Sequence, residues 1–298
     1  MTICMDSVRQ FADVVYRDTG AVIHPEADGD LHRFDDPEGK RNNGACWYVL
    51  HLDGIPAGAY GNWRTGYQST WRADTRSKLD PAERARIDAL VRIAKEKREQ
   101  EKQAAQEKAA HRANVLWRDA VPATVDHPYL AYKCIWALGL RQVGDVLLVP
   151  LRDIDGKLVN MQRINTSGDK RFLWGGRITG CFALAGAQAL PEAGEVYIAE
   201  GSATAATIHQ TLRVPVVAAM NAGNLKPVAE AIRKQYPRLA LVVAADNDHR
   251  TPGNPGMAKG REAASAIDGA LTWPTVCLQH ACTCTDFNDT AHCGRARR

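Results

Sequence analysis

The chain has 298 residues, 45% of them hydrophobic and 24% charged, and its formal net charge is +4. This is the composition of an ordinary soluble protein, and the mildly basic balance permits a nucleic-acid partner without requiring one. No apolar stretch approaches the roughly 20 residues that a membrane span needs, the N-terminus lacks a signal-peptide pattern and the eight cysteines are scattered, so we expect a cytoplasmic protein without a membrane partner.

Residues 1–80 are expected to form an N-terminal module of mixed α and β structure. A helix is predicted up to about residue 20, and two antiparallel strands follow at Trp47–Leu52 and Ala57–Trp63, joined by an Asp53-Gly54 turn. The aromatic side chains of this Gly- and Trp-rich segment have two interpretations. They fill a small core, or they stack on the bases of single-stranded nucleic acid. In the second interpretation the basic partners are His32, Arg33, Arg64 and Arg72.

Residues 81–114 are predicted to form a charged linker helix that marks a domain boundary. Pro81 suits the first helical turn, and the remainder is mainly Ala, Glu, Lys, Arg and Gln. A helix that is polar on all sides is typical of a solvated spacer. A contact with nucleic acid is the alternative, but the mixed charges favour the spacer.

Residues 115–192 are expected to form a small basic subdomain. A helix is predicted from His127 to about Gly139, followed by a hairpin of strands 146–152 and 158–164. Basic residues gather around glycines here and can hold phosphates through charge and exposed backbone amides. The alternative is a set of solvent-facing charges on the rims of the hairpin. The basic residues are Arg152, Arg163, Lys170, Arg171 and Arg177.

Residues 193–276 alternate between apolar strands and helices. Strands are predicted at 195–199, 214–219, 239–245 and about 271–276. Continuous apolar strands linked by helical crossovers are typical of a parallel sheet that is covered on both faces. We therefore expect an α/β fold in this part of the chain.

Three carboxylates follow two of these strands. Because the carboxyl ends of parallel strands meet at one edge of the sheet, Glu200, Asp246 and Asp248 are expected to converge. Their mutual repulsion requires a cation, and hard oxygen ligands favour Mg²⁺ or Mn²⁺. Asp246 and Asp248 are two residues apart and share a face, whereas Asn247 points away.

Further polar residues are expected near the same edge. Asn221 and Asn224 follow the middle strand and either bond a phosphate or sugar or cap the loop and helix. Lys259 and Arg261 begin the helix after the acidic loop and can offset its charge.

Residues 277–298 are expected to form an irregular tail rich in cysteine. The spacing of its cysteines and histidines does not form a pair of C-x₂-C knuckles, so zinc is not expected. The segment Thr285–Asp289 is interpreted as a structural or substrate-side motif. The candidate ligands of the tail are Cys277, His280, Cys282, Cys284, His292 and Cys293.

The acidic motifs resemble the Toprim signature of bacterial-type primases, topoisomerases and some nucleases. Glu200-Gly201 matches its glutamate motif, and Asp246-Asn247-Asp248 matches its aspartate motif. Four further segments resemble the Toprim primases of conjugative plasmids, integrative elements and phages: Gly168–Phe172, Asn221–Leu225, Asn254–Gly256 and Asp286–Asp289. The resemblance covers roughly residues 115–292 and is weaker over 1–80. The sequence contains neither the zinc ribbon of replicative primases nor a helicase P-loop.

The resemblance implies a fold: an α/β Toprim domain with a parallel sheet of about four strands covered by helices. A small α+β primase subdomain and an N-terminal antiparallel α+β module precede it. The implied activity is that of a DNA primase, a nucleotidyltransferase that makes short RNA primers on single-stranded DNA. Glu200, Asp246 and Asp248 would hold two Mg²⁺ or Mn²⁺ ions.

The implied substrates are NTPs and a single-stranded DNA template, and any helicase or replication initiator would be a separate protein. Two alternatives remain, a Toprim nuclease that uses the same metals to cut, and a non-catalytic single-strand-binding accessory protein. The candidate contacts to nucleotide or template are Lys170, Arg171, Arg163, Arg177, Asn221, Asn224 and Lys259.

Overall fold

The computed structural model describes two compact units, and the boundary between them along the chain falls within one long helix. Unit 1 comprises residues 1–98 and unit 2 residues 99–298. The described residues are 2–39, 41–53, 55–73, 81–275 and 282–293. Three features expected from the sequence therefore lie outside the described residues: Gly54 of the first turn, the end of the last strand, and Cys277 and His280 of the tail.

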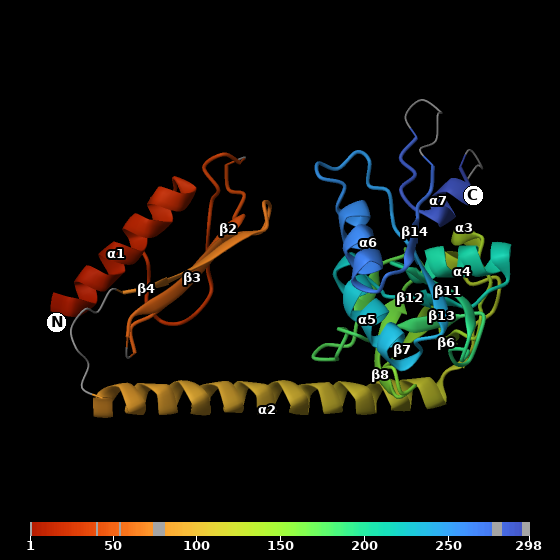
Figure 1. Cartoon of the computed structure of the whole chain (residues 1–298), viewed down its shortest axis with the longest axis horizontal. Coiled ribbons are helices and arrows are strands. Elements are labelled where there is room, and N and C mark those ends of the chain that lie inside the picture. The colour runs from red at the N-terminus through yellow and green to blue at the C-terminus, as the bar shows by residue number, and fades with distance from the viewer. Residues whose placement is uncertain (1, 40, 54, 74–80, 276–281, 294–298) are drawn as a thin grey trace. The chain divides into compact units, whose positions relative to one another are not determined.

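The first unit is a four-stranded antiparallel sheet covered by one helix (Figure 1). Its sheet order is β1-β2-β3-β4. The elements are α1 (Thr2–Thr19), β1 (His32–Phe34), β2 (Cys46–His51), β3 (Ala57–Asn62) and β4 (Tyr67–Arg72). Phe11 and Val15 of α1 pack against Tyr48, Leu50 and Tyr60, so these aromatic side chains form a core rather than a base-stacking surface. Trp63 and Tyr67 lie on the surface.

The predicted charged helix is present and longer than expected. Helix α2 spans Pro81–Asp119, and it is a solvated spacer along only part of its length. In the second unit, Ala109 and Ala113 are buried against a cluster that includes Leu148 and Met161. The small alanine side chains allow the helix to approach the sheet closely. The sequence does not predict this contact, because most of the helix is charged.

The second unit begins with an antiparallel sheet of order β5-β6-β7-β8-β9. The strands are β5 (Val121–Pro122), β6 (Arg141–Val143), β7 (Val146–Arg152), β8 (Leu158–Ile164) and β9 (Lys170–Phe172). Strands β7 and β8 are the predicted hairpin. Helix α3 spans Pro128–Lys133, so the predicted end near Gly139 was wrong. Cys134 adopts a left-handed conformation (φ 52°) and ends the helix.

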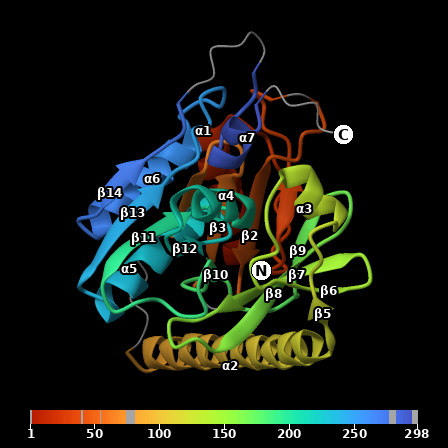
Figure 2. The same ribbon diagram turned by 90° about the vertical axis from the view of Figure 1, so that its right-hand side faces the viewer.

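The remainder of the second unit is the expected α/β sheet, of order β10-β12-β11-β13-β14 (Figure 2). Four strands are parallel, and β10 pairs antiparallel with β12 at one edge. Both faces of the sheet are buried, which explains the continuous apolar runs. The strands are β10 (Ala183–Ala185), β11 (Gly194–Ala199), β12 (Val216–Ala218), β13 (Leu239–Ala244) and β14 (Ala270–Thr272).

Helices cover the two faces of this sheet. Helix α4 (Ser202–Leu212) packs into one core together with the antiparallel sheet. The 3₁₀ helix η1 (Ala222–Asn224) leads into α5 (Leu225–Gln235), and α5 and α6 (Pro255–Ala266) form the other core. Among the described helices, none is both long and apolar enough to cross a bilayer.

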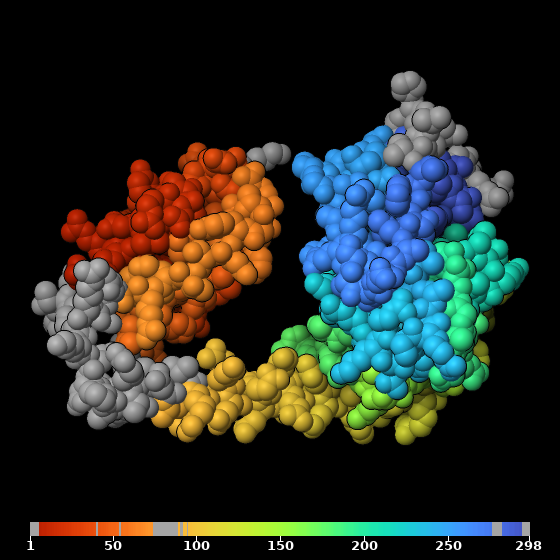
Figure 3. Space-filling model, in the orientation of Figure 1, coloured from red at the N-terminus to blue at the C-terminus, as the bar shows by residue number. Residues whose placement is uncertain are grey.

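The sequence predicts an irregular tail, but part of the tail is helical. Residues Phe287–Ala291 form a short helix, α7, which contacts α4. Much of the surface of the second unit that faces the viewer in Figure 3 belongs to the C-terminal part of the chain, drawn in blue. The tail is thus part of the second unit and brings its own polar residues to the sheet.

Candidate active site

The register of the parallel strands brings the two acidic motifs together. Ala199 of β11 pairs with Ala244 of β13 and with Ala218 of β12. The residues that follow these strands therefore emerge at one edge of the sheet. Glu200 and Asp246 lie there, and the charge of Glu200 helps to raise the pKa of Asp246, as expected of close neighbours.

Asp246 is the most strongly perturbed carboxyl group of the cluster. Its burial, followed by the charge of Glu200 and then that of Asp286, raises its pKa to about 8. Its Oδ1 atom is buried and has no hydrogen-bond partner. Burial and the charge of Asp248 likewise raise the pKa of Glu200. A buried oxygen without a donor, amid like charges, fits a bound divalent cation.

Asp248 is fixed by the start of helix α6. The Gly256 backbone N–H donates to Asp248 Oδ2 at 2.9 Å. A Cβ atom at residue 256 would lie 2.6 Å from the Asp246 carbonyl oxygen and 2.9 Å from Asp248 Oδ2, so only glycine allows this approach. Asn247 points away from the acids, as predicted, because its Nδ2 donates to the Pro274 carbonyl.

Lys170 lies among these carboxylates. Burial lowers its pKa, and the charges of Asp286, Asp246 and Glu200 act in the opposite direction. The residue is exposed by surface area, but its ammonium group is surrounded by protein atoms and lies 5.7 Å from the centre of the Tyr129 ring. The antiparallel sheet thus supplies a cation to the acidic edge of the parallel sheet.

Arg171 and Arg163 lie on the opposite face of the antiparallel sheet from Lys170. They pair with each other across β8 and β9, and Arg163 also pairs with Leu148, which packs in the cluster that α2 covers. Lys170 instead pairs with Ile164 of the other core. Side chains alternate between the two faces along a strand. The predicted cluster of basic residues is therefore split, with Lys170 on one face of the sheet and Arg163 and Arg171 on the other.

Two other basic candidates are engaged in ion pairs. Arg177 contacts Asp153 at 3.1 Å. Lys259 contacts Glu262, one turn along α6, at 2.8 Å. Neither pair includes a carboxylate of the acidic cluster.

Asn224 has a structural role that removes it from the candidate contacts. It is 3% exposed, and its Nδ2 donates to the backbone carbonyls of Ile178, Cys181 and Ala219. Its Oδ1 accepts from the Gly180 N–H. Every polar atom of the side chain is used inside the protein. Asn221 is exposed at the sheet edge and stays a candidate.

Asp286 lies near the carboxylate cluster, although the sequence indicated it only as part of a structural or substrate-side motif and not as a candidate ligand. It caps α7 by accepting from the Asp289 N–H at 2.7 Å, and its charge acts on Glu200, Asp246 and Lys170. The Asp-Phe-Asn-Asp segment indicated a motif, but its position in the cysteine-rich tail gave no reason to group it with the acids of the sheet. Only the docking of α7 shows that its acid belongs with the other three.

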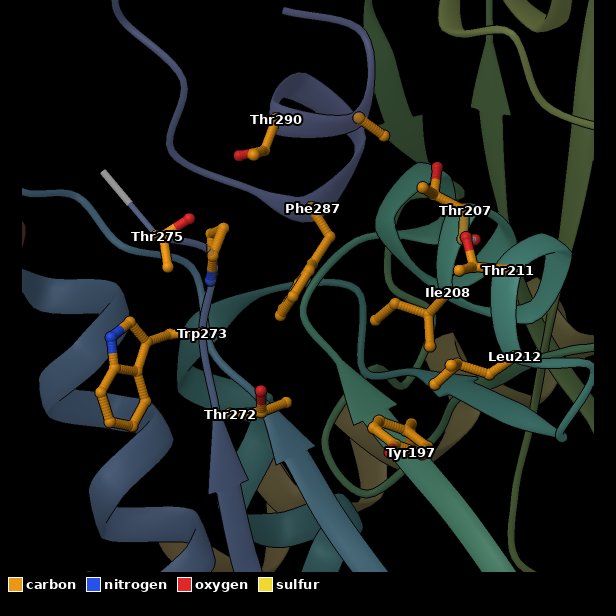
Figure 4. A pocket seen from close by; sticks show the side chains of 12 residues that line it. Tyr197, Thr207, Ile208, Thr211, Leu212, Thr272, Trp273, Thr275, Phe287 and Thr290 are labelled. Atoms are coloured by element: carbon orange, nitrogen blue, oxygen red, sulfur yellow. Dashed lines mark hydrogen bonds between the residues drawn. The ribbon is translucent and has the colours of Figure 1, made fainter. Parts of the chain in front are cut away.

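Two pockets flank this region. One of about 440 Å³ lies beside the cluster and is lined by Tyr129, Tyr132, Lys133, Gly168 and Lys170, among others. The other, of about 450 Å³, lies between α4 and α7, and Figure 4 shows Phe287 extending into it near Ile208 and Tyr197. None of the four acids lines either pocket, but Lys170, which interacts with three of them, lines the first, so the first is the better candidate for a substrate.

Comparison with known proteins defines the class of this domain. Residues 195–296 match the family model of the Toprim domain. The second unit therefore contains a Toprim domain, as its motifs indicated. The match extends past the predicted boundary at residue 276 and takes in Asp286, in agreement with the packing of α7.

Two curated relatives are similar to most of the chain. A DNA primase TraC of Escherichia coli is 38% identical over 280 residues, which are 89% of this chain and 26% of that protein. A second E. coli DNA primase TraC is 36% identical over 261 residues, 84% of this chain and 18% of that protein. The predicted resemblance to Toprim primases is thereby confirmed, although the chain spans only about a quarter of these relatives or less.

Among solved structures, the primase fragment of the bacteriophage T7 primase-helicase protein aligns with a TM-score of 0.40 and 20% identity. The alignment covers 56% of this chain and 65% of that chain. This likeness is too loose to carry structural conclusions.

Proposed function

We propose that the chain carries the catalytic part of a DNA primase, which joins ribonucleotides into short primers on single-stranded DNA. The observation that supports this most is the buried, unpartnered Asp246 Oδ1 amid three further acids and Lys170. A nucleotidyl transfer requires such a cation site next to a positive group. Similarity to proteins named DNA primase points the same way.

Glu200, Asp246 and Asp248 are proposed to bind the metal, and Asp286 to complete the negative site. Two Mg²⁺ or Mn²⁺ ions bound there would activate the attacking 3′-hydroxyl and neutralise the departing pyrophosphate. The Gly256 N–H holds Asp248 in position, and Asn247 anchors the loop from within. The protein thereby keeps the acids in place before the metal arrives.

Lys170 is proposed to bind the phosphates of an incoming NTP. It lines both the acidic cluster and the 440 Å³ pocket, so a nucleotide in that pocket would present its phosphates to the metal. Tyr129 and Tyr132 line the pocket and offer ring surfaces to a base or sugar. Asn221, exposed at the sheet edge, remains a candidate for a sugar or phosphate contact.

Arg163 and Arg171 are proposed to bind the backbone of the template, away from the reacting phosphates. Arg177 and Lys259 are weaker candidates because each is already paired with an acid. A helicase or initiator would act as a separate partner, and such a role on DNA would place the protein in the cytoplasm.

A Toprim nuclease is the second candidate function, since the acids alone would serve cutting as well as joining. Lys170 favours joining, because a polymerising site must hold a triphosphate whereas a cutting site need not. A non-catalytic binding protein would have no reason to retain a buried carboxylate cluster that lacks a donor.

The decisive experiment combines the protein with single-stranded DNA, labelled NTPs and Mg²⁺ or Mn²⁺. We compare the wild type with Glu200→Gln, Asp246→Asn and the control Glu192→Gln, whose carboxylate is 81% exposed. Short RNA made by the wild type and the control, and lost in both site variants, supports the proposal. Template cleavage without new RNA would show a nuclease. DNA binding without either reaction would favour the accessory protein.

A further inference from the structure

Three cysteines of the tail converge around helix α7. The Sγ atoms of Cys282, Cys284 and Cys293 all lie within 4.8 Å of one another. Those of Cys282 and Cys293, eleven residues apart in the chain, are separated by 3.5 Å. Cys282 and Cys284 precede the helix and Cys293 follows it, so the turn of α7 closes the group. The three thiols are only partly exposed.

The spacing of these sulfurs suits a tetrahedral metal. With zinc–sulfur bonds of about 2.3 Å, tetrahedral geometry places neighbouring sulfurs about 3.8 Å apart. A disulfide would instead bring two of them to about 2.05 Å and leave the third thiol alone. The Cys284 backbone N–H also points at Cys282 Sγ, at 3.4 Å. A donor in this position stabilises a thiolate, which is the form that binds metal.

We propose that Cys282, Cys284 and Cys293 bind one Zn²⁺ ion, which holds the two ends of α7 together. Binding releases the thiol protons, and the three thiolates occupy three positions of the tetrahedron. The fourth is open to water or another donor. This revises the expectation from sequence, where the C-x-C and C-x₈-C spacings do not look like a pair of knuckles. The fold supplies the convergence that the spacing lacks.

The metal would hold both ends of α7 together. Asp286, which caps the helix, and Asp289, which pairs with Lys133 at 3.2 Å, lie between the two groups of ligands. The zinc is thus distinct from the carboxylate metal site, because thiolates favour zinc whereas carboxylates favour Mg²⁺ or Mn²⁺.

The test measures the metal content of the full chain after purification without chelator, using inductively coupled plasma mass spectrometry. We expect about one zinc per chain in the wild type and nearly complete loss in Cys282→Ser and Cys293→Ser. Cys134→Ser is the matched control, since Cys134 is exposed and lies outside the group, and it should retain the zinc.

A second measurement keeps the proposal testable if the serine variants fail to fold. Metal-free wild-type protein is titrated with Co²⁺, and a thiolate-to-metal charge-transfer band that added Zn²⁺ abolishes supports the site. The absence of that band, zinc well below one per chain after incubation with Zn²⁺, or a Cys282–Cys293 disulfide found by peptide mass spectrometry would each overturn the proposal.

Discussion

Lys133 and Asp289, 156 residues apart in the chain, form an ion pair at 3.2 Å. The neighbouring Asn288 donates from Nδ2 to the Lys133 carbonyl at 2.7 Å. Together these contacts fasten α7 to α3, and so join the last described helix to the antiparallel sheet and its pocket. These contacts, together with those of α7 to α4, hold Asp286 at the start of α7 near the acidic cluster.

Breaking that ion pair should loosen α7 without touching a proposed metal ligand. Because both side chains are largely buried, we expect Asp289→Asn to lower the unfolding free energy by about 1 kcal/mol. A double-mutant cycle with Lys133→Met, followed by chemical denaturation, measures the coupling. The exposed pair Lys226–Glu262 is the control and should show a smaller coupling. Equal couplings would mean that the Lys133 pair has no special role.

Lys170→Ala and Arg171→Ala should differ, although the two residues are adjacent. Lys170 lies among the acids, whereas Arg171 lies on the other face of the sheet. We expect Lys170→Ala to lower kcat/KM for NTPs by about 100-fold, the magnitude typical of a lost electrostatic contact to a reacting phosphate. Arg171→Ala should mainly weaken binding to single-stranded DNA and reduce its salt dependence. Indistinguishable effects of the two variants on both measurements would refute the separation of faces.

Asp246→Asn should stabilise the metal-free protein while abolishing its metal response. The substitution removes a carboxyl that is buried among like charges, at nearly constant volume. A gain of 1 kcal/mol corresponds to a rise in Tm of about 2–4 °C for a unit of this size. Differential scanning calorimetry with and without Mn²⁺ is the measurement. Mn²⁺ should raise the Tm of the wild type through preferential binding to the folded state and leave that of the variant unchanged.

Gly256→Ala should disturb the loop that carries Asp246 and Asp248 without replacing either carboxylate. The new methyl group would meet the Asp246 carbonyl at 2.6 Å and Asp248 Oδ2 at 2.9 Å, so the loop or the helix must shift. We expect a loss of about 1–3 kcal/mol in stability together with weaker Mn²⁺ binding, both measurable by calorimetry. At Gly223 a Cβ would approach Asn221 Oδ1 at 3.4 Å, an ordinary contact. Gly223→Ala should therefore leave metal binding unchanged.

The first unit should lose stability in acid through Asp18. Hydrogen bonding from the Tyr60 hydroxyl, chiefly, lowers the pKa of Asp18 below its usual 3.8. A depressed carboxyl pKa contributes stability that is complete above about pH 4 and lost as the pH falls through the folded-state value. Tyr60→Phe should reduce this contribution by about 1 kcal/mol. Calorimetry of the full chain between about pH 2 and 6 should then show a shallower acid dependence; an unchanged slope would contradict the assignment.

Most of the second unit is predictable from local sequence patterns. Apolar strands ending in Glu200 and Asp246 require a parallel sheet with acids at one edge, since strand polarity fixes where the following residues emerge. The hairpin of β7 and β8 was equally determined, because its apolar strands and tight turn are local features. The end of α3 at Lys133 was not, since it depends on one left-handed residue, Cys134, that no local pattern marks.

Which side chains share the site depends on how the elements pack. Lys170 and Arg171 look alike in the sequence, and the pairing of β9 with β8 separates them onto two faces. Asn224 resembles a ligand until its buried hydrogen bonds are seen. Asp286 joins the other acids only when α7 docks, and the three tail cysteines come together only through the turn of α7. Contacts between residues far apart in the chain depend on packing, which short-range patterns do not encode.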